Sequence, residues 1–183
     1  MTTIFLIRHG EAAASWQQDA DPGLSDRGRA QAAALVAQLD PLPITAILSS
    51  PMRRARETAA PLAAQRSLPV QILQPFREIP TPASVELADR LAWLKGCAQQ
   101  SWDEVDGLLV EWRRELLESL LALEGNVVVF THFMVMNAVL GAMQNQSKLV
   151  CYQPDYCSVM TLSRLEKDLT LIDLGCQAAS RVL

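Results

Sequence analysis

The amino-acid sequence predicts an α/β protein with three layers (α/β/α), in which helices cover both faces of a mostly parallel central sheet. Three observations support this fold class. Short apolar runs alternate with amphipathic segments, which is typical of parallel strands joined by helical crossovers. The runs Ile4–Ile7 and Val127–Phe130 contain no polar residue, as expected for strands buried on both faces. The length of 183 residues fits a single domain, residues 1–183, with a substantial core.

The first half of the chain predicts three strands and two helices. Ser25 is suited to cap the first helix because its hydroxyl can accept a hydrogen bond from a backbone N–H, and Pro41 ends that helix. Ser49-Ser50-Pro51 starts the second helix, with serine as the cap and proline in the first turn. In chain order we expect a strand over residues 3–8, a helix over 26–39, a strand over 44–48, a helix from Ser50 to about residue 65, and a strand over 69–73.

The second half begins with an irregular segment. Three prolines punctuate residues 75–105, and we expect this stretch to form a lid or a substrate-specificity segment, with a helix that Ser84 caps and that ends near Leu94. The elements expected after it are an amphipathic helix over 104–123, a strand over 127–130, a helix over 133–143, and a β-hairpin with strands over 157–165 and 169–174. The hairpin would add antiparallel strands to the sheet.

Composition and charge exclude several classes of function. The formal net charge is −4 and no basic face stands out, so we expect no nucleic-acid partner and no membrane partner. The N-terminus does not resemble a signal peptide and no apolar stretch would span a membrane, so we expect a cytoplasmic protein with free thiols. Four cysteines without C-x-x-C spacing and only two histidines predict neither a metal site nor a cofactor. A homodimer is the oligomeric state that general frequencies favour.

The two histidines give the strongest indication of function. His9 comes just after the apolar run 4–7, and His132 just after the run 127–130, so each lies where a buried strand ends. Ligands bind at the carboxyl ends of strands in open α/β sheets, and we therefore expect the two imidazoles to face one site. Imidazole is a nucleophile and guanidinium binds phosphate oxygens with paired hydrogen bonds, so histidines with arginine nearby indicate phosphoryl chemistry.

The sequence contains, in this order, LIRHGE at 6–11, LSDRGRAQA at 24–32, SSPMRRARETA at 49–59 and VFTH at 129–132. These four segments resemble the histidine phosphatase superfamily, which includes the cofactor-dependent phosphoglycerate mutases. The ordered set covers nearly the whole chain and is weakest between residues 80 and 105. The resemblance implies a phosphoglycerate mutase-like fold and a metal-independent hydrolase, a phosphatase that acts on a phosphomonoester or related phosphoryl compound through a phosphohistidine intermediate.

The resemblance also assigns a phosphate pocket. His9 matches the nucleophile, and Arg8, Arg54 and His132 match the other three members of the pocket. The arginines would neutralise charge on the transferring phosphoryl group and disfavour protonation of His9. We expect His132 to be an imidazolium that donates to a phosphoryl oxygen. Arg54 would lie in the first turn of its helix, where the backbone dipole favours anions. The other arginines of this helix, Arg53 and Arg56, are expected to be solvated.

A proton must reach the leaving oxygen. Glu78 falls where relatives carry the glutamate that supplies it, although Pro80-Thr81-Pro82 replaces the glycine-containing stretch that many of them have there. The alternative interpretation of Glu78 is an ion pair with Arg77 or another surface cation. Glu11 is a second candidate for the acid, but it is expected to orient its neighbours.

Three residues close to His9 have both a functional and a structural interpretation. Ser15 stands where many members carry asparagine, and its hydroxyl could still donate to phosphate. Gly10 permits a close approach of the backbone to the substrate, or is simply a turn residue. Trp16 forms a wall of the substrate site, or packs as a partly buried aromatic ring.

Three other functions remain open from the sequence. A phosphoglycerate mutase would use the same covalent step, but that group usually has a larger enclosed site and a longer chain. The altered segments at 12–15 and 80–82 also fit a phosphoryl-binding module with little turnover. A short, open site fits a protein phosphohistidine phosphatase, whose partner would be a phosphoprotein instead of a small phosphorylated molecule.

Overall fold

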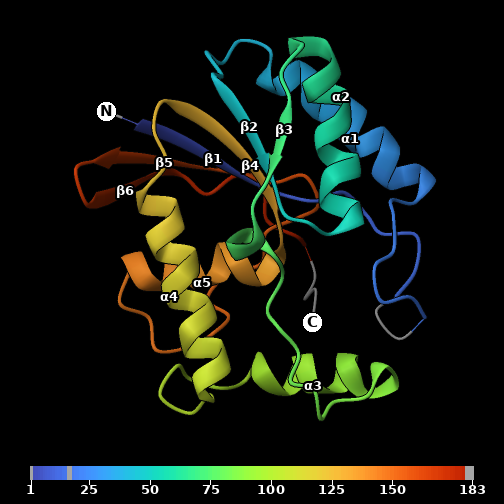
Figure 1. Ribbon diagram of the computed structural model, residues 1–183, viewed down its shortest axis with the longest axis vertical. Coiled ribbons are helices and arrows are strands. Elements are labelled where there is room, and N and C mark those ends of the chain that lie inside the picture. The colour runs from blue at the N-terminus through green and yellow to red at the C-terminus, as the bar shows by residue number, and fades with distance from the viewer. Residues whose placement is uncertain (1, 16–17, 180–183) are drawn as a thin grey trace.

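A mixed sheet runs through the centre of the protein (Figure 1). The computed structural model describes residues 2–15 and 18–179, and this part of the chain contains the strands β1 (Thr2–Arg8), β2 (Ala46–Ser49), β3 (Val70–Ile72), β4 (Asn126–Thr131), β5 (Val159–Leu165) and β6 (Asp168–Asp173). Their order across the sheet is β3-β2-β4-β1-β5-β6. The first four strands of this order are parallel, and β5 and β6 are antiparallel. The predicted, mostly parallel sheet and the terminal hairpin are therefore confirmed.

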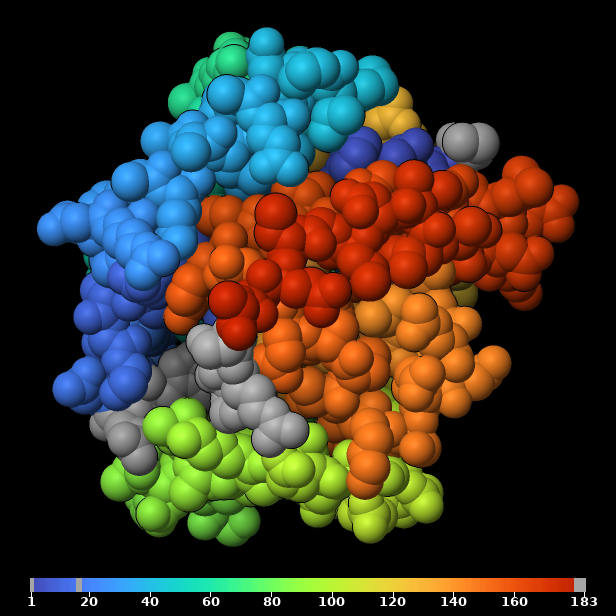
Figure 2. Space-filling view, turned by 180° about the vertical axis from the view of Figure 1, so that it is seen from behind, coloured from blue at the N-terminus to red at the C-terminus, as the bar shows by residue number. Residues whose placement is uncertain are grey.

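Helices cover both faces of the sheet, as predicted (Figure 1). The helices α1 (Asp26–Leu39) and α2 (Arg53–Arg66) pack on one apolar core, and α4 (Gly107–Leu121) and α5 (Phe133–Met143) pack on a second core across the sheet. The remaining elements are the short helix α3 (Arg90–Cys97) and the 3-10 turns η1 (Gln74–Phe76) and η2 (Leu87–Asp89). Seen from behind, the segment that contains α3 forms a green band along one end of the molecule (Figure 2). No helix in the described residues is long and apolar enough to cross a membrane.

Local signals explain the helices whose bounds match the prediction. Ser25 caps α1, because its Oγ accepts a hydrogen bond from the Gly28 N–H at 2.9 Å. Helix α5 also has the predicted bounds, and the side chains from Phe133 to Gly141 are all buried. A helix that is apolar on every side belongs in a core, and here it lies between the sheet and α4.

Three predicted helix starts are wrong. Helix α2 begins at Arg53 and its N-cap residue is Met52, which makes no side-chain cap, while the Ser50 hydroxyl accepts from the Met52 N–H at 3.2 Å and contacts His132 Nε2. Helix α4 begins after Asp106, whose Oδ1 accepts from the Leu109 N–H at 3.2 Å, and not near Glu104. Ser84 caps no helix. A turn and η2 follow it, and α3 starts only after Asp89.

The register of the parallel strands places polar residues together at one edge of the sheet. Arg8, the last residue of β1, pairs with Thr131, the last residue of β4. Beyond this pair the His9 N–H donates to the Thr131 carbonyl at 3.0 Å, and the Ser50 N–H donates to a β4 carbonyl at 2.9 Å. His9, Ser50 and His132 therefore leave the sheet at the same edge.

Candidate active site

His9 follows β1 directly, and both of its ring nitrogens are engaged. Nδ1 lies 2.7 Å from the Gly10 carbonyl oxygen, which can only accept, so Nδ1 carries the proton. Nε2 has the lone pair and accepts a hydrogen bond from Arg54 Nε at 3.0 Å. Burial, and then the charges of Arg54 and Arg8, hold the pKa of His9 well below its ordinary value. His9 is thus a neutral imidazole with its nucleophilic nitrogen defined.

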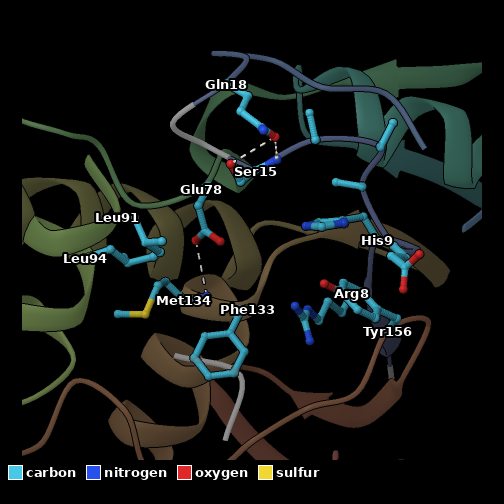
Figure 3. A pocket seen from close by; sticks show the side chains of 14 residues that line it. Arg8, His9, Ser15, Gln18, Glu78, Leu91, Leu94, Phe133, Met134 and Tyr156 are labelled. Atoms are coloured by element: carbon cyan, nitrogen blue, oxygen red, sulfur yellow. Dashed lines mark hydrogen bonds between the residues drawn. The ribbon is translucent and has the colours of Figure 1, made fainter. Parts of the chain in front are cut away.

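Arg8 is buried beside His9 and its guanidinium is held against aromatic rings. Nη1 donates to the Pro154 carbonyl at 2.9 Å. The guanidinium carbon lies 4.1 Å from the centroid of the Tyr156 ring and 5.4 Å from that of Phe133, which are cation–π contacts. Figure 3 shows Arg8, His9 and Tyr156 on one side of a pocket. A guanidinium fixed in this way can bind two oxygens of one phosphoryl group.

Arg54 comes from the first turn of α2 and is 1% exposed. The Thr58 hydroxyl ties this turn to the end of β1, because it donates to the Arg54 carbonyl at 2.7 Å and accepts from the Gly10 N–H at 3.0 Å. The other arginines of the helix, Arg53 and Arg56, are exposed, as predicted. Helix register therefore directs Arg54 alone among the three toward His9.

His132 is fully buried at the start of α5, and its ring centroid lies 5.1 Å from that of His9. Its Nε2 is 2.7 Å from Ser50 Oγ. Burial, and then the charge of Arg54, hold the pKa of His132 well below its ordinary value. The lowered pKa disfavours the expected imidazolium, because a further positive charge beside Arg54 and Arg8 in a buried position is unfavourable. Neutral His132 can still donate one hydrogen bond.

Glu78 follows η1 and faces the same cavity. Its Oε1 accepts from the Ile79 N–H at 3.0 Å and from the Met134 N–H, in the first turn of α5, at 3.2 Å. Burial raises the pKa of Glu78 and outweighs the lowering by Arg54 and by these two N–H groups. The interpretation as a surface ion pair with Arg77 does not fit a buried carboxyl group that is held by backbone N–H groups.

Gly10 and Gly28 allow α1 to approach the end of β1 closely. A Cβ on Gly28 would lie 2.1 Å from the Glu11 carbonyl oxygen, and one on Gly10 would lie 2.7 Å from the Gly28 carbonyl oxygen. The Glu11 carboxylate accepts from the Ser25 hydroxyl at 2.8 Å and so orients the cap of α1. Gly10 thus contributes a packing contact and the carbonyl that holds His9.

Ser15 lies on the exposed rim of the cavity, away from the buried cluster. Its N–H and its hydroxyl both donate to Gln18 Oε1, at 3.2 and 3.3 Å (Figure 3). A phosphate contact by Ser15 would require this pair to separate, and it stays a prediction. Trp16 lies outside the described residues.

A cavity of about 500 Å³ connects these groups, a volume that suits a small-molecule ligand. Its polar side contains Arg8, His9 and Glu78. The irregular segment between residues 75 and 105 contributes Leu91 and Leu94 to the wall, as a lid would. Within the described part of the chain, no group of three or more His, Cys, Asp or Glu side chains could hold a metal ion.

The sequence reasoning missed three residues of the site. Ser50 follows β2 at the same sheet edge as the histidines, so the argument from strand ends could have found it. Tyr156 belongs to no motif in the loop before β5. Arg90 begins α3, and its Nε donates to Thr81 Oγ1 at 2.8 Å. A single arginine in an irregular segment of the sequence does not by itself indicate a site residue. Arg90 lies near enough to help lower the pKa of His132.

Comparisons with known proteins agree with this geometry. The family model for the histidine phosphatase superfamily (branch 1) matches residues 4–177. The chain is 42% identical to an uncharacterized protein of Mycobacterium tuberculosis over 74 aligned residues. The aligned stretch covers 38% of this chain and 37% of that protein. The chain is also 39% identical to a Schizosaccharomyces pombe protein described as a probable phosphatase, over 80 aligned residues. That stretch covers 41% of this chain and 38% of the other protein. These matches span well under half the length of the curated relatives.

The fold is also similar to solved structures. A mycobacterial glucosyl-3-phosphoglycerate phosphatase superposes with a TM-score of 0.74 at 21% sequence identity, over 96% of this chain and 99% of that one.

Proposed function

Because this chain belongs to the histidine phosphatase superfamily, we propose that it is a hydrolase that cleaves phosphomonoesters through a phosphohistidine at His9. The observation that carries the proposal is the state of His9. Its Nδ1 proton is held by the Gly10 carbonyl, and its Nε2 lone pair meets a guanidinium beside a cavity that also contains Glu78. A neutral imidazole in a cationic surrounding is suited to attack an anionic phosphoryl group.

In the first step the phosphoryl oxygens bind to Arg8 and Arg54. They compete with His9 for the Arg54 guanidinium, which frees Nε2 of its hydrogen bond. Nε2 then attacks phosphorus, the N–P bond forms, and the P–O bond to the alcohol breaks. The two guanidinium groups neutralise charge on the transferring group, and neutral His132 supplies a hydrogen bond.

Glu78 handles the proton in both steps. It donates a proton to the leaving alcohol and becomes a carboxylate. It then removes a proton from the water that attacks the phosphohistidine, so that the N–P bond breaks and inorganic phosphate leaves. Two features support this role: backbone N–H groups fix Oε1, and the raised pKa of Glu78 keeps the carboxyl group protonated to a higher pH.

The substrate, the location and the oligomeric state of the enzyme are also proposals. We infer a small phosphorylated molecule as the substrate, since the cavity has the volume for one. A cytoplasmic location fits the free thiols of all four cysteines. The homodimer stays a prediction that sedimentation would check.

The proposal is tested by trapping the intermediate. Brief reaction with a ³²P-labelled phosphomonoester in EDTA should give an acid-labile, base-stable adduct, and peptide mapping should place it on His9. His9→Ala should abolish the adduct and lower turnover by several orders of magnitude, whereas Arg56→Ala, a change at the exposed surface of α2, should leave both intact. An adduct on serine or cysteine, or loss of activity in EDTA, would contradict the mechanism. Interconversion of phosphoglycerates without release of phosphate would indicate a mutase.

A further inference from the structure

The side of the cavity away from His9 is apolar. Leu91 and Leu94 of α3 line it together with Met134 of α5, and in Figure 3 Glu78 lies between these side chains and His9. The loop after β1 contributes Ala12, Ala13 and Ala14 to the lining of the cavity, together with the polar side chains of Ser15 and Gln18. Since Glu78 protonates the leaving oxygen in the proposed function, the carbon atoms of the leaving alcohol extend from Glu78 toward this wall.

None of the described side chains of this apolar side carries a positive charge. Among the described residues that line the cavity, Arg8 is the only cation, and it lies beside His9 where the phosphoryl group binds. The carboxyl groups that line the cavity are those of Glu11 and Glu78. Arg90, which precedes Leu91 in α3, is near enough to act electrostatically on Glu78 and His132, but it does not line the cavity, and its Nε donates to Thr81 Oγ1 at 2.8 Å. An ester whose alcohol carries a carboxylate would therefore place that charge against apolar side chains, at a cost in desolvation.

The apolar side chains are part of the protein core. Leu94 and Met134 are 3% and 1% exposed and belong to the cluster of buried residues between the sheet, α4 and α5. Leu91 is half-buried and lines the cavity. The wall is thus formed before the substrate binds, and apolar surface of the substrate that it covers is removed from water without rearrangement.

We propose that the preferred substrates are phosphomonoesters of uncharged, largely apolar alcohols, whose apolar group binds between α3 and the start of α5. This inference rests on the proposed function and names its substrate class.

The test uses the n-alkyl phosphates ethyl, butyl and hexyl phosphate. Their alcohols have nearly the same acidity, so the bond that breaks is equally reactive and only the apolar contact changes. We expect kcat/KM to rise about fourfold for each methylene that the wall covers, which is the equivalent of about 0.8 kcal/mol. The 5-carboxypentyl ester, which matches the hexyl ester in length, should be at least about tenfold poorer than hexyl phosphate.

A second measurement does not depend on turnover. Ethylphosphonate and hexylphosphonate cannot be hydrolysed, and their Kd values for the wild-type protein should differ in the same direction. Leu91→Asn should flatten the dependence on chain length in both measurements while ethyl phosphate is still hydrolysed. Leu87→Asn is the matched control, because Leu87 lies in the same segment, is 41% exposed and does not line the cavity. This control should retain the full dependence.

The outcomes separate this inference from the proposed function. Hydrolysis with equal kcat/KM across the series, a preference for the carboxylated ester, or an undiminished chain-length dependence in Leu91→Asn would overturn the substrate class and leave the reaction intact. Phosphonate binding that strengthens with chain length, without hydrolysis of any ester, would support the apolar wall and overturn the reaction. Phosphonate binding that is independent of chain length, without hydrolysis, would overturn both.

Discussion

Burial is the main cause of the pKa shifts of three side chains in the site. The pKa values of His9 and His132 are lowered and that of Glu78 is raised, so each shift favours the uncharged form. Arg8 and Arg54 remain cationic because the ordinary pKa of a guanidinium is far above neutral. The result is a pocket in which Arg8 and Arg54 supply positive charge beside His9 and in which burial favours the uncharged forms of His9, His132 and Glu78, an arrangement suited to a phosphate dianion.

The role of Glu78 can be tested with two leaving groups. Glu78→Gln should lower kcat/KM for butyl phosphate by about 10²- to 10⁴-fold, because an alkoxide needs a proton to leave. The loss for p-nitrophenyl phosphate should be much smaller, since p-nitrophenolate leaves without one. For butyl phosphate the wild-type rate should fall as pH rises through the raised pKa of Glu78, because the protonated carboxyl group is the active form. On the acid side the rate should fall only well below the ordinary histidine pKa, where His9 takes up a proton.

The matched control is Glu118→Gln, which removes a carboxylate from an exposed ion pair with Arg114 on α4. It should leave both substrates and the pH profile unchanged. Equal losses for the two substrates in Glu78→Gln would show that Glu78 acts through structure and not as an acid.

At the level of elements, the position of His9 depends on how closely α1 approaches the end of β1. The contact is made by two glycines and by the Glu11 backbone, and the Ser25–Glu11 hydrogen bond fixes the helix end there. Helix α2 is tied to the same point through Thr58 and Gly10. The site is therefore assembled where two helices and a strand end converge.

Two glycine-to-alanine substitutions distinguish the effect of close packing on stability from the effect of helix propensity. Gly28→Ala should lower the free energy of unfolding by about 1–3 kcal/mol, because its Cβ would meet the Glu11 carbonyl oxygen at 2.1 Å and backbone must move. The same change should lower phosphatase activity, since Glu11 adjoins the His9–Gly10 turn. Gly96→Ala in α3 has no heavy atom within 4 Å of the new Cβ and should raise the free energy of unfolding by about 0.5–1 kcal/mol. Chemical denaturation measures both, and a stabilised Gly28→Ala would contradict the close contact.

For the whole molecule, the buried histidines link folding to pH. The pKa values of His9 and His132 are about 6.5 in an unfolded chain and well below that when folded. As pH falls below about 6.5 the unfolded state takes up protons that the folded state does not, so each histidine lowers stability by up to about 1.4 kcal/mol per pH unit. Glu78 has the opposite effect, because its raised pKa adds stability at low pH that is lost as pH rises through that pKa.

The histidine contribution can be isolated by comparing variants. Between about pH 6.5 and 5, the stability of His132→Gln should depend on pH less steeply than that of the wild type, by up to about 1.4 kcal/mol per pH unit. Urea denaturation across this range measures the two slopes. Identical slopes would mean that His132 is protonated in the folded protein.

The sequence by itself determined the fold class, the bounds of α1 and α5, and the strand ends that carry His9 and His132. These follow from signals within a few residues: an apolar run, a serine that caps its own helix, and a motif with fixed spacing. The resemblance to a family added Arg54 and Glu78, which no local pattern would have singled out from their neighbours.

The tertiary structure alone decided the contact of Ser50, the lowered pKa of His132 and the apolar wall. The Ser50 hydroxyl, which accepts from the Met52 N–H before α2, also contacts His132, which is 82 positions away in the chain. The pKa of His132 is lowered because segments that are distant in sequence bury it and place Arg54 nearby. Leu91 and Met134 line one cavity although they are 43 positions apart in the chain. Burial and charge at a site are sums over residues from the whole chain, so a local pattern does not contain them.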